Sequence, residues 1–469
     1  MKKHAMGVGA ASASASAKPT RYRWVIASLF FVIYTIAAAD RANLGVALPF
    51  LRKEFAMSNA EAGALVSLFL IAYAIAQLPS AWLVSTFGVR KVFSISMILT
   101  SIATGLTGMV GSLFSLKICR IGLGFAEGPL PIGIAATINR WFPASEKGTA
   151  SGIFLSAVKF GPVLTPILGA TIIAAWGWKE VFLIFAIPGI FLSVVWFLMV
   201  ADKPSQSRAI NRAELDIISE GSGDGGSISQ GSASKAMPWL DRFIRVRPEK
   251  ILDTTRGIFT SWNIYGCALG YCCQLGISSV LLAWIPTYLL TVKKFSIMGM
   301  GFVAAAPWVG AVVGNILGGL LSDRLLGRRR KPGMMLSALA TVGMMFALIH
   351  SPADPLLYAV LIFLTGMLLS VGYSAYMVYP MPFVSKAKFP MANAIVNMGG
   401  QLGGAATPFI TGILLDSYGW SSVFGFMAGI SALTFVVLLT IREPLEVVAP
   451  HSRAVGVNRK TYGDHVERS

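Results

Sequence analysis

The chain has 469 residues, of which 55% are hydrophobic and 13% are charged, and its mean hydropathy is +0.68. A soluble protein is typically about 25% charged, so this composition leaves too little polar surface to cover several soluble cores and excludes a water-soluble enzyme. The formal net charge of +18 comes from basic residues spread over short loops between apolar runs, whereas a nucleic-acid-binding protein concentrates them on one face or helix. The composition therefore indicates a polytopic membrane protein without a nucleic-acid partner.

Twelve apolar segments follow a tail at residues 1–23, which is basic and rich in Ala and Ser and has no signal-peptide pattern. A helix needs about 20 apolar residues to cross a bilayer. Nine such segments contain no charged residue: 62–89, 92–116, 181–201, 257–292, 295–322, 332–353, 355–385, 389–415 and 417–441. Three more contain charges: 24–51, 118–139 and 148–178. We therefore predict an all-α membrane protein with twelve transmembrane helices.

Residues 202–256 separate six helices (24–201) from six others (257–441), and a tail follows at 442–469. The centre of this segment is a Gly/Ser-rich linker, and its end, WLDRFIRVRPEK, predicts a short interfacial helix. A regulatory role for the segment is the alternative to a plain linker. With the N-terminus inside, 30 Lys and Arg residues fall in inner segments and 6 in outer loops, which favours two cytoplasmic termini.

The two halves contain related sequences. TPILGATIIAAWGWKEVF (165–182) and TPFITGILLDSYGWSSVF (407–424) match at six positions with one offset of 242 residues and no gaps. Parallel repeats of this kind are related by an axis normal to the membrane, and substrate sites lie between them near the midplane. The architecture implies alternating access, although a fixed pore stays open as an alternative.

Two loops resemble the Gly-x-x-x-Asp-Arg-x-x-Gly-Arg-Arg motif of the major facilitator superfamily. GGLLSDRLLGRRR, in the second half, has Asp323 and Arg324 at the acidic and basic positions. AWLVSTFGVRK, in the first half, keeps Gly88 and Arg90 but has neutral residues where the acid and base belong. The resemblance implies that these residues control conformation, and the contact between an Asp and a helix N-terminus is expected to depend on Asp323.

Four further segments resemble the anion:cation symporter family of that superfamily, which includes galactonate, hexuronate, glucarate and phthalate permeases: ADRANLGVALP (39–49), RIGLGFAEGPLPIG (120–133), NRWFPASEKGTA (139–150) and MANAIVNMGGQLGGAATP (391–408). The resemblance implies the major facilitator fold and proton-driven uptake of an organic anion, such as a sugar acid or a mono- or dicarboxylate. The site residues that it implies are Asp40, Arg41, Tyr73, Arg120, Glu127 and either Asn393 or Asn397.

The charged residues inside the predicted helices point to the same site without the resemblance. There are five, all in the first half: Asp40, Arg41, Arg120, Glu127 and Lys159. A charge at the bilayer centre costs about 3 kcal/mol on the most lenient scale, and such residues usually face a cavity. These five are therefore expected to face one another or water rather than lipid.

Helical spacing groups the polar residues into stripes. Arg120 and Glu127 are seven residues apart, as are Tyr34 and Arg41, so each pair lies within about 20° on one helix face and about 10 Å apart along it. In the second half, Asn393, Asn397 and Gln401 form one stripe and Tyr271, Gln274 and Ser278 form another. One half thus offers charges and the other neutral hydrogen bonds to an anion.

Arginine binds a carboxylate through two parallel N–H donors, so Arg41 and Arg120 are predicted to bind the substrate. Asp40 and Glu127 are predicted to couple transport to protons: protonation frees the arginines for the anion. Two alternatives stay open, namely that Asp40 only caps or pairs with Arg41 and that Arg120 only packs.

Lys159 departs from the pattern expected of sugar-acid permeases and is offset by 242 residues from Gln401. One interpretation is a third cation for a second acidic group, which favours a dicarboxylate or an aromatic acid. The other is a lysine that extends to the membrane surface or pairs with Glu127 or Asp40.

No cofactor is expected beyond the proton gradient as energy source. The four His lie near termini or helix ends, and no phosphate-binding Gly-x-x-x-x-Gly-Lys loop or catalytic triad occurs, so a metal site, an ATP-driven pump and an enzyme are all disfavoured. We predict a monomeric proton symporter in a bacterial inner membrane, in contact with lipid, its anionic substrate and protons. An anion exchanger on the same fold is the alternative.

Overall fold

The computed structural model describes residues 18–143, 145–220, 246–248, 251–326, 329–352, 354–385 and 388–445. Eleven helices in these ranges are long and apolar enough to cross a membrane. A twelfth, α16 (Phe389–Ser417), has the length but is more polar, because it carries the stripe of Asn393, Asn397 and Gln401. The predicted twelve-helix fold is confirmed.

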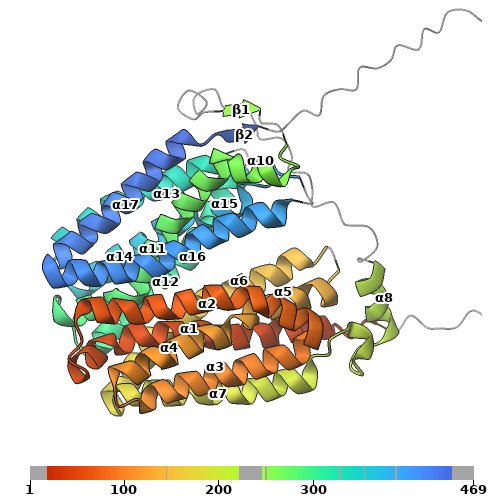
Figure 1. Cartoon of the computed structure of the whole chain (residues 1–469), viewed down its shortest axis with the longest axis horizontal. Coiled ribbons are helices and arrows are strands. Elements are labelled where there is room, and N and C mark those ends of the chain that lie inside the picture. The colour runs from red at the N-terminus through yellow and green to blue at the C-terminus, as the bar shows by residue number, and fades with distance from the viewer. Residues whose placement is uncertain are drawn as a thin grey trace, which may run out of the picture.

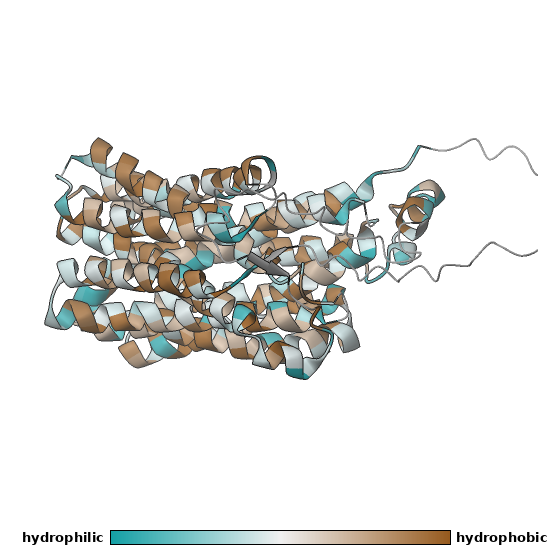
Figure 2. Ribbon diagram, turned by 90° about the horizontal axis from the view of Figure 1, so that it is seen from above, coloured by the Kyte–Doolittle hydropathy of each residue, from teal (hydrophilic) through white to brown (hydrophobic). Residues whose placement is uncertain are grey.

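The helices form two bundles that lie side by side (Figure 1). The N-terminal bundle contains α1 (Tyr22–Glu54), α2 (Asn59–Phe87), α3 (Val89–Met109), α4 (Leu113–Glu127), α5 (Pro129–Trp141), α6 (Lys147–Ala175) and α7 (Trp178–Met199). The C-terminal bundle contains α11 (Trp262–Thr291), α12 (Ile297–Leu320), the π-helical turn η2 (Leu321–Leu325), α13 (Lys331–His350), α14 (Pro355–Val371), α15 (Tyr373–Val378), α16 and α17 (Trp420–Thr440). Large apolar side chains such as Ile75, Leu78 and Trp82 are exposed on the outside of the helices, and hydrophobic residues extend along the helices (Figure 2). This surface suits contact with lipid tails.

Short elements between the bundles and after the last helix lie at the end of the molecule that the basic residues predict to be cytoplasmic. They are η1 (Pro204–Gln206), α8 (Arg212–Glu220), α10 (Thr255–Thr260), and the parallel strands β1 (Val246–Pro248) and β2 (Glu443–Leu445). The strand β1 lies inside the segment for which the sequence predicts an interfacial helix, so that prediction is wrong for these three residues. The other residues of that segment up to 250 lie outside the described ranges. The pairing of β1 with β2 was not predictable locally, because the two strands are far apart in the chain.

The repeat seen in the sequence is a repeat of packing. Gly161 of α6 lies against the backbone of α1 at Thr35, and Gly403, 242 residues later, lies against the backbone of α11 at Cys272. A Cβ at either glycine would collide with a carbonyl oxygen of the neighbouring helix. Glycine therefore permits the same close helix crossing in both bundles.

Two transmembrane helices contain a one-residue irregularity, one in each bundle. The fourth has it at Gly128 between α4 and α5, and the tenth at Gly372 between α14 and α15. Both glycines keep right-handed helical dihedrals, so Leu113–Trp141 and Pro355–Val378 are each one span, as expected. At the first irregularity Pro129 begins α5, because proline lacks a backbone N–H and suits the first position of a helix. Two other segments end earlier than expected: α3 at Met109 instead of 116, and α15 at Val378 instead of 385.

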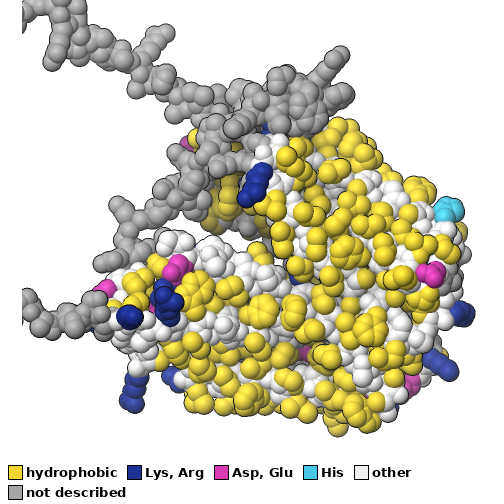
Figure 3. All heavy atoms as spheres, turned by 180° about the vertical axis from the view of Figure 1, so that it is seen from behind, with side chains coloured by type: hydrophobic (Ala, Val, Ile, Leu, Met, Phe, Trp, Pro, Cys, Tyr) yellow, Lys and Arg dark blue, Asp and Glu magenta, His cyan; other side chains and the backbone are white. Residues whose placement is uncertain are grey.

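The two bundles are in closest contact at the end opposite α8. There Gly45 of α1 lies against Leu282 of α11, and Gly63 of α2 lies against Pro408 of α16. Asp416 of α16 accepts hydrogen bonds from the first backbone amides of α2, at 2.9 and 2.8 Å. At the cytoplasmic end a hollow separates the bundles (Figure 3). In the orientation that the basic residues predict, the protein is closed on the outside and open to the cytoplasm.

Candidate functional site

An ion pair between α1 and α4 lies at the middle of the N-terminal bundle. Arg41 and Glu127 approach to 2.5 Å, and the Arg41 Nε also donates to the same carboxylate oxygen, Oε1, at 2.6 Å. The Glu127 side chain is fully buried, whereas 20% of the Arg41 side chain is exposed. The arginine is therefore the accessible partner of the pair.

Aromatic side chains surround the Arg41 guanidinium. Its carbon lies 4.6 Å from the centre of the Tyr73 ring and 5.9 Å from that of Phe69. Its Nη2 donates a hydrogen bond to the Tyr34 hydroxyl at 3.2 Å. Tyr34 and Arg41, which the i, i+7 spacing placed on one face, are thus in direct contact. These rings hold the guanidinium in place by cation–π attraction.

A second group of charges lies deeper in the same bundle. Asp40 and Arg120 are each 1% exposed. Asp40 accepts a hydrogen bond from the Asn43 amide at 3.3 Å and lies near Arg120 and Thr104. The Nε and Nη2 of Arg120 and one Asp40 oxygen have no hydrogen-bond partner among the described residues. Arg120 also lies 5.6 Å from the Phe182 ring, so it faces the bundle interior rather than the hollow.

Lys159 reaches across from α6 to the C-terminal bundle. Its ammonium lies 4.2 Å from the centre of the Tyr373 ring and 5.8 Å from that of Trp308. Tyr373 in turn bonds to the hydroxyl of Tyr271 at 3.0 Å. In the described part of the chain Lys159 pairs with no carboxylate, so the pairing with Glu127 or Asp40 that the sequence left open is not found.

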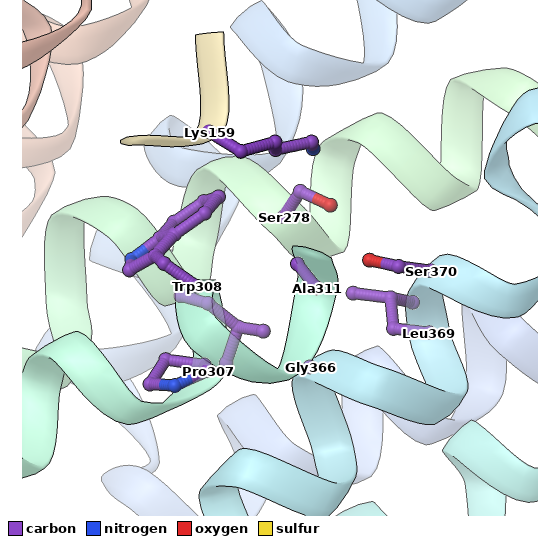
Figure 4. A pocket seen from close by; sticks show the side chains of 9 residues that line it. Lys159, Ser278, Pro307, Trp308, Ala311, Gly366, Leu369 and Ser370 are labelled. Carbon is purple, nitrogen blue, oxygen red and sulfur yellow. The ribbon is translucent and has the colours of Figure 1, made fainter. Parts of the chain in front are cut away.

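Lys159 lies beside a pocket between three helices of the C-terminal bundle. Its walls are Leu281 of α11, Pro307, Trp308 and Ala311 of α12, and Gly366 and Leu369 of α14. The hydroxyls of Ser278 and Ser370 face this space (Figure 4). Sequence reasoning missed Trp308 and Ser370 as pocket residues, because spacing along one helix does not reveal what faces it from another.

The polar stripes of the C-terminal bundle are used in different ways. In α16, the Gln401 amide donates to the Asn397 side chain at 3.4 Å, and the Asn393 side-chain oxygen has no partner among the described residues. In α11, Gln274 is buried and donates to the backbone oxygen of Leu369 in α14. Gln274 therefore joins two helices of its own bundle with the amide that was expected to contact substrate.

The acid that the motif of the first half lacks comes from the segment after α7. Gly88, at φ +85°, precedes α3, and the carboxylate of Asp202, just after α7, accepts a hydrogen bond from the Arg90 backbone amide at 2.9 Å. The Arg90 side chain donates to the Phe197 carbonyl at 2.6 Å. An acid at a helix N-terminus is favourable, so Asp202 occupies the place that the sequence of this loop leaves neutral. Arg324 is exposed, and the side chain of Asp323 lies outside the described part.

The site is suited to binding and to proton exchange rather than to bond chemistry. Within the described ranges no three His, Cys, Asp or Glu residues gather as metal ligands. Instead, an arginine and a glutamate pair between α1 and α4, and Lys159 of α6 reaches the other repeat, where aromatic rings and two serine hydroxyls lie near it. Together with the fold, this arrangement defines a multi-pass membrane transport protein.

The chain belongs to the Major Facilitator Superfamily, whose sequence model matches residues 30–388 and 346–463. It is 28% identical over 436 residues to the probable sulfoacetate transporter SauU of Cupriavidus necator, covering 90% of this chain and 96% of that one. It is 27% identical to the probable galactarate/D-glucarate transporter GudP of Bacillus subtilis, covering 95% and 96%. The D-galactonate transporter of Escherichia coli O6:H1 is 28% identical, with 90% and 97% covered.

Solved structures share the fold. A bacterial homologue of the human lysosomal transporter Spinster, in an inward-facing and occupied conformation, aligns with a TM-score of 0.70 at 16% identity, over 89% of this chain and 95% of that one. A D-xylose–proton symporter aligns with a TM-score of 0.69 at 16% identity, over 90% and 98%. The expected membership of this superfamily and its fold are confirmed.

Proposed function

We propose that the protein is a secondary active transporter that imports an organic anion together with protons by alternating access. The observation that carries the proposal is the Arg41–Glu127 pair, a partly exposed cation that is held by a buried carboxylate. Relatives whose names refer to sugar acids and sulfoacetate support an anionic substrate. The proton gradient would supply the energy, with no cofactor, and the protein would act as a monomer in the bacterial inner membrane.

Arg41 is the group to which we assign the substrate carboxylate. Its planar guanidinium offers two parallel donors to a carboxylate. In the structure, one oxygen of Glu127 contacts both Nε and Nη2. Tyr34, Tyr73, Asn393, Asn397 and Gln401 would provide hydrogen bonds to the rest of the molecule. An incoming anion therefore competes with Glu127 for the same donors.

Proton coupling follows from that competition. When a proton neutralises Glu127, the carboxylate stops competing and Arg41 becomes available to the anion. A bound anion in turn makes release of the proton less favourable, because it would leave two negative charges on one cation. Asp40, near Arg120, would be a second site that takes up a proton. Arg120 would then interact with Asp40 rather than with the substrate.

Anion exchange is the second candidate function. It is favoured by one observation, the ammonium of Lys159, which has no carboxylate partner in the described part of the chain. A fixed positive charge without a neutralising acid would require an anion on both the inward and the outward path.

Transport into proteoliposomes tests the proposal and separates the two functions. Purified protein would be assayed with aldonates, aldarates, hexuronates and phthalate, with and without an inward proton gradient. A symporter accumulates its substrate when the gradient is imposed, and the Glu127→Gln variant loses this accumulation but keeps exchange of internal for external substrate. Glu180→Gln, at the outer end of α7, is the matched control. Uphill uptake by Glu127→Gln at the wild-type level would refute the coupling role, and uptake that always requires internal anion would favour the exchanger.

A further inference from the structure

Lys159 differs from the other two cations in the N-terminal bundle. Arg41 is paired with Glu127, and Arg120 lies near Asp40. The Lys159 ammonium meets only the faces of Tyr373 and Trp308 in the described part of the chain. Cation–π attraction holds the charge in place, but a ring face accepts no full hydrogen bond and provides no counter-charge. The ammonium is therefore free to bind an anionic group.

The pocket beside Lys159 supplies further donors to such a group. Ser370 is 4% exposed, and its hydroxyl has no hydrogen-bond partner among the described residues. The Ser278 hydroxyl lies in the same pocket. It donates a hydrogen bond to the carbonyl of Gln274 at 3.1 Å, and its oxygen can still accept one. Trp308 and Pro307 form an apolar wall of the pocket (Figure 4). A half-buried ammonium with a free hydroxyl beside it suits a carboxylate or a sulfonate.

A line of tyrosines joins this pocket to Arg41. Tyr73 lies under the Arg41 guanidinium and near Tyr271, and Tyr271 bonds to Tyr373, over which Lys159 lies. Two cations thus stand at the ends of one line of phenol groups. A molecule with an acidic group at each end and a polar chain between them matches that order of groups.

We propose that Lys159, Ser370 and the pocket between α11, α12 and α14 form a second anion subsite, so that the transported substrate is a small organic dianion, either a dicarboxylate or a carboxylate–sulfonate. The inference rests on the function proposed above, because the first acidic group binds at Arg41. Lys159 belongs to one bundle and Ser370 to the other, so the second acidic group also links the two halves.

Binding of matched acid pairs to the purified full chain in lipid nanodiscs tests this subsite. The pairs are galactonate with galactarate and acetate with sulfoacetate, and calorimetry gives each dissociation constant. The wild-type protein is expected to bind the dianion of a pair at least about tenfold more tightly than the monoanion, as a charge-assisted hydrogen bond allows. Lys159→Gln is expected to remove this preference without changing the affinity for the monoanion, and Lys147→Gln, on the same helix, is the control.

Ser370→Ala provides a second test that keeps every charge. It is expected to weaken dianion binding about threefold to tenfold and to leave monoanion binding unchanged. Equal losses for both members of a pair in Lys159→Gln, or an unchanged dianion affinity, would overturn the subsite while leaving the anion site intact. Arg41→Gln separates failure of the subsite from failure of the proposed function, because it should weaken binding of both members of a pair. Wild-type affinity in that variant would overturn the proposed function as well. So would the absence of binding of any acid to the wild-type protein.

Discussion

Glu127 holds Arg41 with only one of its two carboxylate oxygens. Oε1 accepts a hydrogen bond from Nε and lies 2.5 Å from Nη2 of the guanidinium, whereas Oε2 is buried and has no hydrogen-bond partner among the described residues. A buried carboxylate oxygen without a partner is costly, and a proton on Oε2 would remove part of that cost. The geometry thus provides a place for the proton on the same residue that competes with the anion for Arg41.

The first prediction concerns the pH dependence of anion binding. Glu127→Gln places a neutral amide beside Arg41 at every pH, so anion binding should become independent of pH and, at pH 8, about tenfold tighter than in the wild-type protein. The wild-type affinity should rise as the pH falls from 8 to 6. Calorimetric titration at the two pH values measures both effects, with Glu180→Gln as control. A variant that keeps the wild-type pH dependence would show that another group takes up the proton.

The second prediction concerns the buried pair of Asp40 and Arg120. Removing one partner of a buried pair leaves an uncompensated charge, which is more costly than losing both. Arg120→Met should therefore lower the melting temperature by about 5 °C, and the double variant Asp40→Asn with Arg120→Met should recover more than half of this loss. Differential scanning fluorimetry measures the four proteins of the cycle.

The same double variant tests the role of Arg120 in binding. The sequence predicts that Arg120 grips the substrate, whereas its guanidinium is 1% exposed and lies beside Phe182. We expect the double variant to bind the anion within about threefold of the wild-type affinity, because Arg41 is intact. A stable double variant that no longer binds would show that Arg120 does contact the substrate.

The sequence carried enough information for the bundle plan because lipid imposes a simple requirement. Each spanning helix must be long and apolar, and a charge inside one must have a polar neighbour, so both the helices and the five embedded charges stood out. The one-residue irregularities at Gly128 and Gly372 were not predictable, because glycine and proline are also common inside regular membrane helices.

Contacts between side chains on different helices were the part of the site that sequence spacing could not predict. Spacing placed Tyr34 and Arg41 on one helix face, about 10 Å apart along it, and their hydrogen bond is a finding of the structure. The donation from Gln274 to Leu369 and the approach of Lys159 to Tyr373 depend on how separate helices pack, and no local pattern encodes that. Asp202 illustrates the same limit: the acid that the first motif lacks is about 110 residues away from Arg90 in the chain.

The third prediction concerns the repeated helix crossings. Gly403→Val and Gly161→Val each place a side chain against the backbone of a neighbouring helix, at Cys272 and Thr35 respectively. Both should lower the melting temperature and the yield of folded protein, since helix backbones cannot separate without losing their packing. Gly122→Val, where a Cβ meets nothing within 4 Å, is the matched control. A fluorescence size-exclusion profile of each variant measures folding, and equal profiles for Gly122 and Gly403 variants would contradict the close crossing.

The fourth prediction concerns the attachment of α8 to the start of α1. Glu214 of α8 accepts hydrogen bonds from the backbone amides of Tyr22 and Arg23, at 2.9 and 3.1 Å, and from the Thr20 hydroxyl. Burial raises the pKa of Glu214, but these hydrogen bonds outweigh it, and its pKa lies below the ordinary value. A carboxyl whose pKa is lowered by folding stabilises the attachment above its ordinary pKa, and this contribution is lost as the pH falls through the lower, folded value.

We therefore expect α8 to stay attached at pH 7 and pH 5 and to detach below about pH 4, the ordinary range of a glutamate. A nitroxide label at Ser219, which is exposed, reports this as a change from an immobile to a mobile spectrum. Glu214→Gln should be mobile at pH 7 already, since a neutral amide binds the backbone N–H groups more weakly. The control is Asp216→Asn, which changes an exposed acid on the same helix and should match the wild-type protein. If the label in the Glu214→Gln variant is as immobile as in this control, apolar packing alone holds α8.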